Sequence, residues 1–146
     1  MWCSIFLIAC VSLVTAQAAP AVSDPYAEDM KNRNQIALEC INEVNIDIKI
    51  VRKAIYAMPY ELPTDEKYKK FLTCSYKKQK FQSENGEMLY DNINDFLSRS
   101  YSRDDLKILD QCKNITAPND AEMAYTSLKC IMKGLHGIKK TEDNTD

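Results

Sequence analysis

Few side chains in this chain of 146 residues are suited to covalent or metal chemistry. The single histidine is His136, so a multi-histidine metal site is excluded and a catalytic triad could form only around that residue. A histidine near the end of the last predicted helix is typical of a solvated side chain, with a pH switch as the alternative. Three glycines leave no room for Gly-rich phosphate-binding loops. We therefore predict no catalytic residue, no metal site and no cofactor, and we do not expect an enzyme.

The first 19 residues have the pattern of a secretory signal peptide. They carry no charged side chain, residues 5–14 are predominantly apolar, and small residues follow. Ten apolar residues rise about 15 Å as a helix, half the thickness of a bilayer's hydrocarbon core, so stable membrane insertion is not expected. We predict cleavage after Ala16 or Ala18 and a secreted protein. The alternative is a buried N-terminal helix.

Cleavage of this segment would change the cysteine count. Cys3 and Cys10 would leave with the signal peptide, and four of the six cysteines would remain. An even number of cysteines in a secreted chain predicts disulfides, here two. They would involve Cys40, Cys74, Cys112 and Cys130. The same secretory route makes Asn114, in the sequence Asn-Ile-Thr, a candidate N-glycosylation site.

The elements that must position these residues are all helical. Apolar residues recur at three- and four-residue steps, and no convincing strand alternation is present. Cap residues support the helix starts, with Asp24 before Pro25, Thr64 or Asp65, and Ser102. The polar residues 139–146 are predicted to be a disordered tail. The six predicted helices span about 25–44, 45–56, 65–81, 89–97, 103–113 and 120–138, with proline breaks at 59 and 63 and a turn at 83–86.

Length and charge limit the classes of function. A chain of this length fits one domain, here residues 19–138. The formal net charge is −2 and the isoelectric point is near 5.5. Binding to nucleic acid would require a basic face, so no nucleic-acid partner is expected.

The cysteine frame resembles that of a known family. The stretches between Cys40, Cys74, Cys112 and Cys130 contain 33, 37 and 17 residues. With the signal peptide, the size and the helical pattern, this spacing is similar to that of insect odorant-binding proteins of the pheromone/general odorant-binding class. The segment 119–125 before Cys130 and the Asn-Gly turn at 85–86 match the same family.

The family's usual pattern has six cysteines, and two of them are missing here. Counting from the neighbouring cysteines, the missing ones would occupy the positions of Lys70 and Ala121. Because these two are partners in the family, their joint loss leaves no unpaired thiol. The chain looks like the four-cysteine, "minus-C" subgroup, in which one cross-link between the third and sixth helices is absent.

The resemblance implies a fold and a ligand site. It implies an all-α, six-helix fold around an apolar cavity, with disulfides Cys40–Cys74 and Cys112–Cys130. Other pairings, such as Cys40–Cys130 with Cys74–Cys112, stay open on the sequence alone. Methionine suits a cavity that accepts variable apolar shapes, and a tyrosine hydroxyl can hold a ligand oxygen. The predicted ligand-binding residues are Ile55, Phe71, Leu72, Tyr76, Met88, Leu89, Ile93, Leu97, Tyr125, Leu128, Met132 and Leu135, with Tyr76 and Tyr125 as candidate polar anchors.

The predicted function is extracellular carriage of small hydrophobic molecules such as odorants or pheromones. A chemosensory receptor is a candidate partner, and the protein is expected to be a monomer or a weak homodimer. One alternative is a secreted helical signalling protein that acts through its surface. Another is the same carrier fold working in a non-olfactory secretion.

Overall fold

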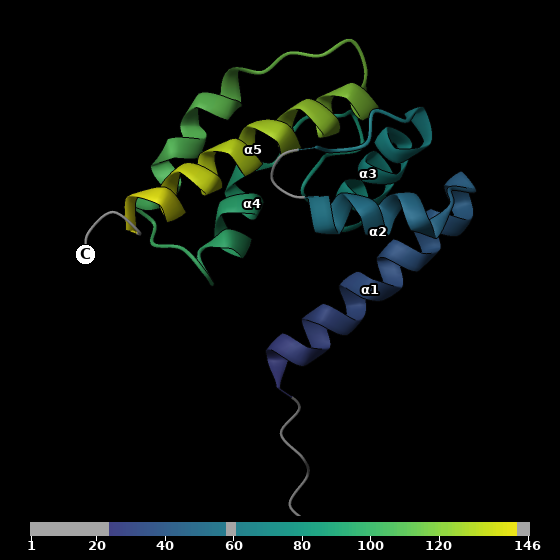
Figure 1. Ribbon diagram of the computed structural model, residues 1–146, viewed down its shortest axis with the longest axis horizontal. Coiled ribbons are helices and arrows are strands. Elements are labelled where there is room, and N and C mark those ends of the chain that lie inside the picture. The colour runs from purple at the N-terminus through teal and green to yellow at the C-terminus, as the bar shows by residue number, and fades with distance from the viewer. Residues whose placement is uncertain (1–23, 58–60, 143–146) are drawn as a thin grey trace, which may run out of the picture.

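The computed structural model describes residues 24–57 and 61–142, and these residues form helices joined by loops (Figure 1). The predicted all-α fold is confirmed. One isolated antiparallel bridge, between Gln82 and Met88, occurs in the described residues, and no strand does. The predicted signal peptide, Cys3 and Cys10 lie outside the described residues. The elements are α1 (Pro25–Val44), α2 (Ile48–Ala57), α3 (Glu66–Lys78), α4 (Tyr90–Leu97), the 3₁₀-helix η1 (Asp105–Asn114) and α5 (Asp120–Glu142).

Two aspartates begin helices as predicted. The side chain of Asp24 accepts a hydrogen bond from the backbone N–H of Tyr26, 3.0 Å away, just before Pro25. Asp65 accepts from the N–H groups of Lys67 and Tyr68 at 2.8 and 3.2 Å. Both caps satisfy backbone donors that have no partner inside the helix.

The boundary between α1 and α2 is a Schellman-type end rather than a bend. Asn45 adopts a left-handed conformation with φ 53°, and the N–H of Ile46 donates to the carbonyl of Ile41 over 3.2 Å. This geometry turns Ile46 inward, where it is 5% exposed. Asp47 then accepts from the N–H of Lys49 at 2.8 Å and begins α2.

The fifth helix differs from the prediction, because it is a 3₁₀-helix and not an α-helix. Leu106, Leu109 and Cys112 follow one another at three-residue steps and are all buried. In a 3₁₀-helix residues i and i+3 eclipse, so all three line up on one face, whereas in an α-helix each such step would turn the side chain by about 60°. The N-cap is Asp104 and not the predicted Ser102, although the hydroxyl of Ser102 accepts from the N–H of Asp105 at 3.1 Å.

Two helix ends also differ from the prediction. α3 ends at Lys78 and not near Phe81, because the chain reverses at Lys80, which has a φ of 61°. α5 continues to Glu142, past the boundary predicted at Ile138. The last residues of α5 are Lys, Thr and Glu. The helix can continue through them because its hydrogen bonds are local to the backbone and do not require an apolar face.

The helices pack in the spatial order α1, α3, α5, η1, α4. In Figure 1, α5 crosses the upper part of the molecule beside η1, and α1 lies below it, rising from the bottom centre toward the right. Their apolar faces form two clusters. The Cys40 cluster consists of Cys40, Ile46, Val51, Ala54, Tyr68, Phe71, Leu72, Ala124, Tyr125 and Leu128. The Cys112 cluster consists of Ile93, Leu106, Leu109, Cys112 and Ile131.

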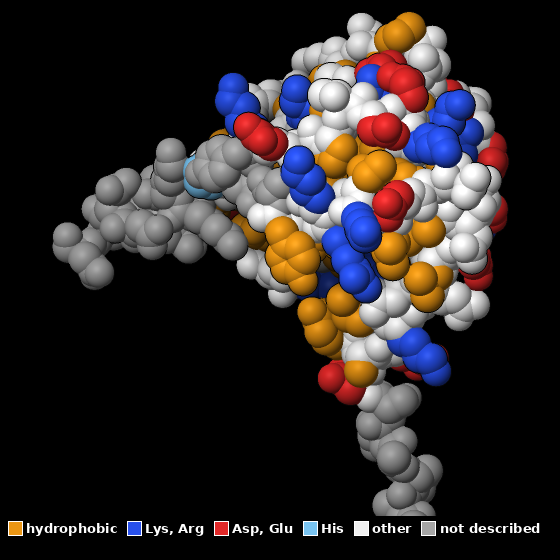
Figure 2. Space-filling view, turned by 45° about the vertical axis from the view of Figure 1, so that its right-hand side comes forward, with side chains coloured by type: hydrophobic (Ala, Val, Ile, Leu, Met, Phe, Trp, Pro, Cys, Tyr) orange, Lys and Arg blue, Asp and Glu red, His pale blue; other side chains and the backbone are white. Residues whose placement is uncertain are grey.

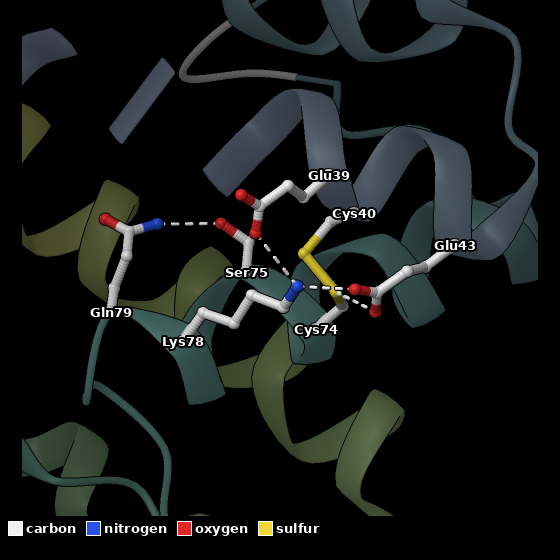
Figure 3. The surroundings of a disulfide bond; sticks show 7 residues. All are labelled: Glu39, Cys40, Glu43, Cys74, Ser75, Lys78 and Gln79. Atoms are coloured by element: carbon white, nitrogen blue, oxygen red, sulfur yellow. Dashed lines mark hydrogen bonds and ion pairs between the residues drawn. A yellow bond between two sulfur atoms is a disulfide. The ribbon is translucent and has the colours of Figure 1, made fainter. Parts of the chain in front are cut away.

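Each cluster contains one disulfide. Cys40 pairs with Cys74 and joins α1 to α3, and Cys112 pairs with Cys130 and joins η1 to α5. These are the pairings that the family resemblance implied. Figure 3 shows that Lys78 lies beside the first bridge and forms ion pairs with both Glu39 and Glu43 of α1. The same two helices are therefore joined by a covalent bond and by surface charges.

The predicted turn at 83–86 ties the middle of the chain to the start of α5. Gly86 has a φ of +90°, and a Cβ built there would clash with the carboxylate of Asp120. Beside it, Nε2 of the buried Gln82 donates to the carbonyls of Gly86 and Asp120, at 2.9 and 3.0 Å. Lys77 forms an ion pair with Asp120 at 2.6 Å. The positive φ of Gly86 favours glycine at this position, since other residues rarely adopt it.

Candidate functional site

Half of the predicted ligand-binding residues gather at the Cys40 cluster. Phe71 and Leu72 of α3 are 6% and 5% exposed, and Tyr125 and Leu128 of α5 face them. Two further predicted residues, Tyr76 and Met132, are partly buried against this cluster. α3 and α5 thus bring residues from distant parts of the sequence onto one apolar surface.

Four other predicted residues belong to the Cys112 cluster. Ile93 is 5% exposed, and Met88, Leu97 and Leu135 pack against it while partly buried. Leu89 is also partly buried, at the start of α4. The predicted set is therefore divided between two clusters, and α5 contributes to both.

The prediction for Ile55 is corrected by the structure. Its side chain is 60% exposed on the outside of α2. The buried side chains of α2 are Val51 and Ala54, so the apolar residue on the next turn is rotated past the core. Helical periodicity alone does not show how far the buried stripe of an amphipathic helix extends.

Tyr76 lies where the two clusters meet. Tyr76 packs against the Cys40 cluster, and Phe81 packs against the Cys112 cluster. The rings of Tyr76 and Phe81 are in edge-to-face contact, with 5.9 Å between their centroids. Burial raises the pKa of the Tyr76 phenol, and the hydroxyls of Tyr68 and Tyr90 raise it further. The phenol therefore stays protonated and can donate a hydrogen bond. Among the described residues, no partner accepts that bond.

The second candidate anchor, Tyr125, is already engaged. Its hydroxyl donates to the backbone carbonyl of Leu62 over 3.3 Å. The ammonium groups of Lys69 and Lys129 lie 5.3 and 5.6 Å from its ring centre. Through these contacts Tyr125 holds the 61–65 segment against α5, whereas the hydroxyl of Tyr76 has no such partner among the described residues.

Sequence reasoning missed a cationic contact between α1 and α4. The guanidinium of Arg33 lies 3.9 Å from the ring centre of Phe96, and Arg99 lies over the same ring at 5.5 Å. Asp29 forms ion pairs with both arginines, at 2.9 and 2.7 Å. Hydrogen bonding to Arg33 holds the pKa of the Asp29 carboxyl below its usual value. The i, i+4 spacing of Asp29 and Arg33 was visible in the sequence, but the aromatic partner was not.

Two open cavities lie outside the predicted site. One, of about 390 Å³, lies between α2 and the segment before α3, and its lining residues are Ile50, Lys53, Glu61, Leu62, Pro63, Thr64 and Asp65. The other, of about 280 Å³, lies between α4 and η1, and its lining residues are Asp91, Asn94, Asp95, Arg103, Leu106, Lys107 and Asp110. Neither contains a predicted ligand-binding residue. The second is mostly charged, which does not suit an apolar ligand.

The structure also gives the positions of the candidate glycosylation site and of the single histidine. Asn114 is exposed at the end of η1, and Ile115 after it is extended. His136 lies within α5 and is partly buried. In residues 24–57 and 61–142, no group of acidic, histidine and cysteine side chains is arranged to hold a metal ion. None of the described helices is both long enough and apolar enough to cross a bilayer.

Comparison with known protein families gives a match that spans most of the helices and all four disulfide-bonded cysteines. The model of the PBP/GOBP family matches residues 23–134. The chain belongs to the PBP/GOBP family. The match includes both disulfides and all the helices up to most of α5, which agrees with the resemblance to pheromone and general odorant-binding proteins.

Two proteins of one insect species are similar to the chain over most of its length. The B1 protein of the beetle Tenebrio molitor is 27% identical over 124 residues, which cover 84% of the chain and 90% of that protein. The B2 protein of the same species is also 27% identical and is covered to 91%.

Solved structures have the same fold. A fatty-acid-binding protein from the oral disk of the blowfly Phormia regina matches with a TM-score of 0.62 and 22% identity, covering 75% of the chain and 94% of that protein. An odorant-binding protein from Drosophila melanogaster matches with a TM-score of 0.64 and 18% identity, covering 77% and 96%. At these identities the likeness establishes the fold alone.

Proposed function

We propose that the protein carries small hydrophobic molecules through an aqueous secretion. The observation that carries this proposal is the family membership, joined to the apolar surface that α3 and α5 form between the two clusters. The names of the structural neighbours, one binding fatty acids and one odorants, support the same class of ligand. Binding is by burial and involves no covalent step.

The expected affinity follows from apolar burial. Removing apolar area from water contributes about 25 cal/mol per Å². Ordering of the ligand and of side chains offsets much of this gain. A dissociation constant in the micromolar range, about −8 kcal/mol, is the natural result.

We further propose that Tyr76 is the polar anchor. A protonated phenol that lacks a partner among the described residues can donate to a ligand carbonyl, hydroxyl or carboxylate oxygen. Met88 and Met132, both partly buried, lie at the borders of the two clusters and can adapt to ligands of different shape. The chemistry of the site then favours an apolar chain with one oxygen function.

A displacement assay tests the carrier function. The mature protein should bind an apolar fluorescent probe, and neutral ligands of about 10–18 carbons should displace it with micromolar affinity. Leu128→Asp should abolish this, because a carboxylate buried among apolar groups would have to be desolvated. Leu38→Asp is the matched control, since Leu38 is 54% exposed on α1 and should tolerate the same change.

Two further variants keep the test decisive if Leu128→Asp does not fold. Leu128→Phe keeps the site apolar and should exclude the longest ligands first. Tyr76→Phe should lower affinity for alcohols and acids while leaving affinity for hydrocarbons unchanged. If folded wild-type protein takes up no probe, or only probe that these ligands never displace, the carrier proposal fails and the signalling-protein alternative gains support. The tissue of expression separates olfactory from non-olfactory use.

We also propose secretion with a four-cysteine mature chain. The full sequence has six cysteines, four of which form the two disulfides. Signal cleavage after Ala16 or Ala18 would remove Cys3 and Cys10 and leave the minus-C pattern. The intact mass of the secreted protein should then match a chain that begins at Gln17 or Ala19 and lacks four hydrogens. A longer chain or a free thiol would contradict this proposal.

The exposed Asn114 is proposed to carry an N-linked glycan on this secretory route. The residue ends η1, and its neighbour is extended, so an added glycan would meet no packed element. The same mass measurement would show the glycan, and Asn114→Gln would remove it. An unmodified mass for the secreted wild type would contradict the proposal.

A further inference from the structure

The outward face of α2 is both basic and apolar. Over its ten residues the helix carries Lys49, Arg52 and Lys53 and no acidic residue. All three cations are exposed. Beside them Ile55 and Tyr56 are 60% and 86% exposed, unusual values for large apolar side chains.

Helical geometry places these residues on one side. At 100° per residue, the buried Val51 and Ala54 define the inner face together with the partly buried Ile50. The opposite half of the helix carries both apolar and basic side chains. Around it, in order, lie Ile55, Ile48, Arg52, Tyr56, Lys49 and Lys53. Figure 2 shows basic and apolar side chains mixed on the side of the molecule that it brings forward.

The cations of this face form no ion pair with a described residue, although Glu61 and Asp65 line the same cavity as Lys53. By contrast, ion pairs are formed by three lysines of α3, Lys69, Lys77 and Lys78. The net charge of the whole chain is −2, so this positive face is a local feature and not a consequence of composition.

We propose that α2 docks the protein onto an anionic lipid surface. Helices with basic residues between exposed apolar ones bind the membrane interface, with cations at the phosphate groups and apolar side chains at the acyl boundary. Tyrosine is enriched at that depth because its ring is apolar and its hydroxyl polar. The exposed apolar side chains of α2, Ile55 and Tyr56, line neither of the two cavities described above. A fluid bilayer can receive them without shape complementarity, which favours lipid over an acidic protein surface.

The cavity of about 390 Å³ connects this face with the interior. Ile50 and Lys53 of α2 line one side of it, and Leu62 lines another. Leu62 packs against the Cys40 cluster, and its carbonyl accepts from Tyr125. Docking through α2 would bring this opening beside the bilayer, in which apolar ligands dissolve. This step, delivery or collection of ligand at a lipid surface, rests on the proposed carrier function, whereas the docking itself does not.

Vesicle flotation with the mature protein tests the docking. Wild-type protein should float with phosphatidylcholine vesicles that contain phosphatidylserine and should not float with pure phosphatidylcholine. Arg52→Glu changes the face by two charges and should weaken binding about 30-fold. Lys133→Glu is the matched control, because Lys133 is exposed on α5 and the charge change is identical. Tyr56→Ser should weaken binding about tenfold by removing the apolar contact.

Two results would overturn the proposal. The first is a wild-type protein that does not float with anionic vesicles at low salt, which would leave an acidic protein as the partner for this face. The second is equal loss of binding in Arg52→Glu and Lys133→Glu, which would show that overall charge and not α2 is responsible. Circular dichroism and probe displacement in solution verify that each variant is folded. A wild-type protein that floats with anionic vesicles but does not bind the probe would reject the carrier function and leave the docking proposal intact.

Discussion

The Cys40 cluster and the Cys112 cluster differ in size, in chemistry and in the helices that build them. The Cys40 cluster buries three aromatic residues, Tyr68, Phe71 and Tyr125, between α-helices. The buried side chains of the Cys112 cluster are aliphatic apart from its cysteine, and a 3₁₀-helix supplies three of its five residues. Aromatic residues such as Phe81 and Tyr90 surround this second cluster and are only partly buried.

The difference shows how one helix can serve two environments. α5 contributes Ala124, Tyr125 and Leu128 to the Cys40 cluster and, one turn later, Ile131 to the Cys112 cluster. A ligand held at Tyr76, where the clusters meet, would touch both. Because the two clusters differ in composition, their stabilities should respond differently to changes in the disulfides and in pH. Three experiments can test this difference.

Removal of the disulfides should have the largest effect, and it should be unequal. In the chain-entropy model, a bridge across the 34-residue separation of Cys40 and Cys74 contributes about 4 kcal/mol, and one across the 18 residues from Cys112 to Cys130 about 3 kcal/mol. Urea unfolding of the two double Cys→Ser variants should show the greater loss for Cys40 and Cys74. A greater loss for Cys112 and Cys130 would mean that packing, not loop closure, sets the contribution of each bridge.

A third bridge should sharpen the same comparison. Lys70→Cys with Ala121→Cys would join α3 to α5 at the Cys40 cluster, next to the ion pair of Lys69 with Glu122 at 2.6 Å. We expect the oxidised double variant to melt about 10 °C higher than wild type. The reduced form of the same variant is the control and should show no gain. Two free thiols after oxidation would show that the family alignment of these positions is wrong.

The smallest predicted effect distinguishes two tyrosines by pH. Burial raises the pKa of Tyr68 in the Cys40 cluster to about 12, so its neutral form is favoured in the folded state. This contribution is complete below pH 10, the unfolded pKa, and is lost as the pH rises toward 12. Wild type should therefore lose about 1 kcal/mol relative to Tyr68→Phe between pH 9 and pH 11.

Tyr90 provides the contrast at the Cys112 cluster. Its hydroxyl donates to the carbonyl of Cys112 over 2.7 Å, so Tyr90→Phe should lower stability by about 1 kcal/mol already at pH 7. Tyr68→Phe should be near neutral at pH 7, since no hydrogen bond of the Tyr68 hydroxyl exists among the described residues. Denaturant unfolding at both pH values would check the pair. A loss at pH 7 from Tyr68→Phe would indicate a hydroxyl contact at that position.

Local patterns were enough to predict the all-helical fold and the starts of α1 and α3. Capping by Asp24 and Asp65 depends on residues within one turn, and so does the Gly86 turn. The disulfide pairs were implied by the family resemblance, and the structure confirms them. Eleven of the twelve predicted ligand-binding residues are at least partly buried, because a residue on the apolar stripe of a helix usually faces another helix.

Only the tertiary structure decided the features that depend on neighbours far away in the sequence. The exposure of Ile55 depends on how α2 is rotated against the core, and the burial of one face of η1 depends on its contact with α5. The packing of Arg33 on Phe96, and the division of the apolar residues between two clusters, likewise require elements that are distant along the chain. Periodicity shows which side of a helix is apolar. It does not show how much of that side is covered, because coverage depends on the angle and distance at which the next helix packs.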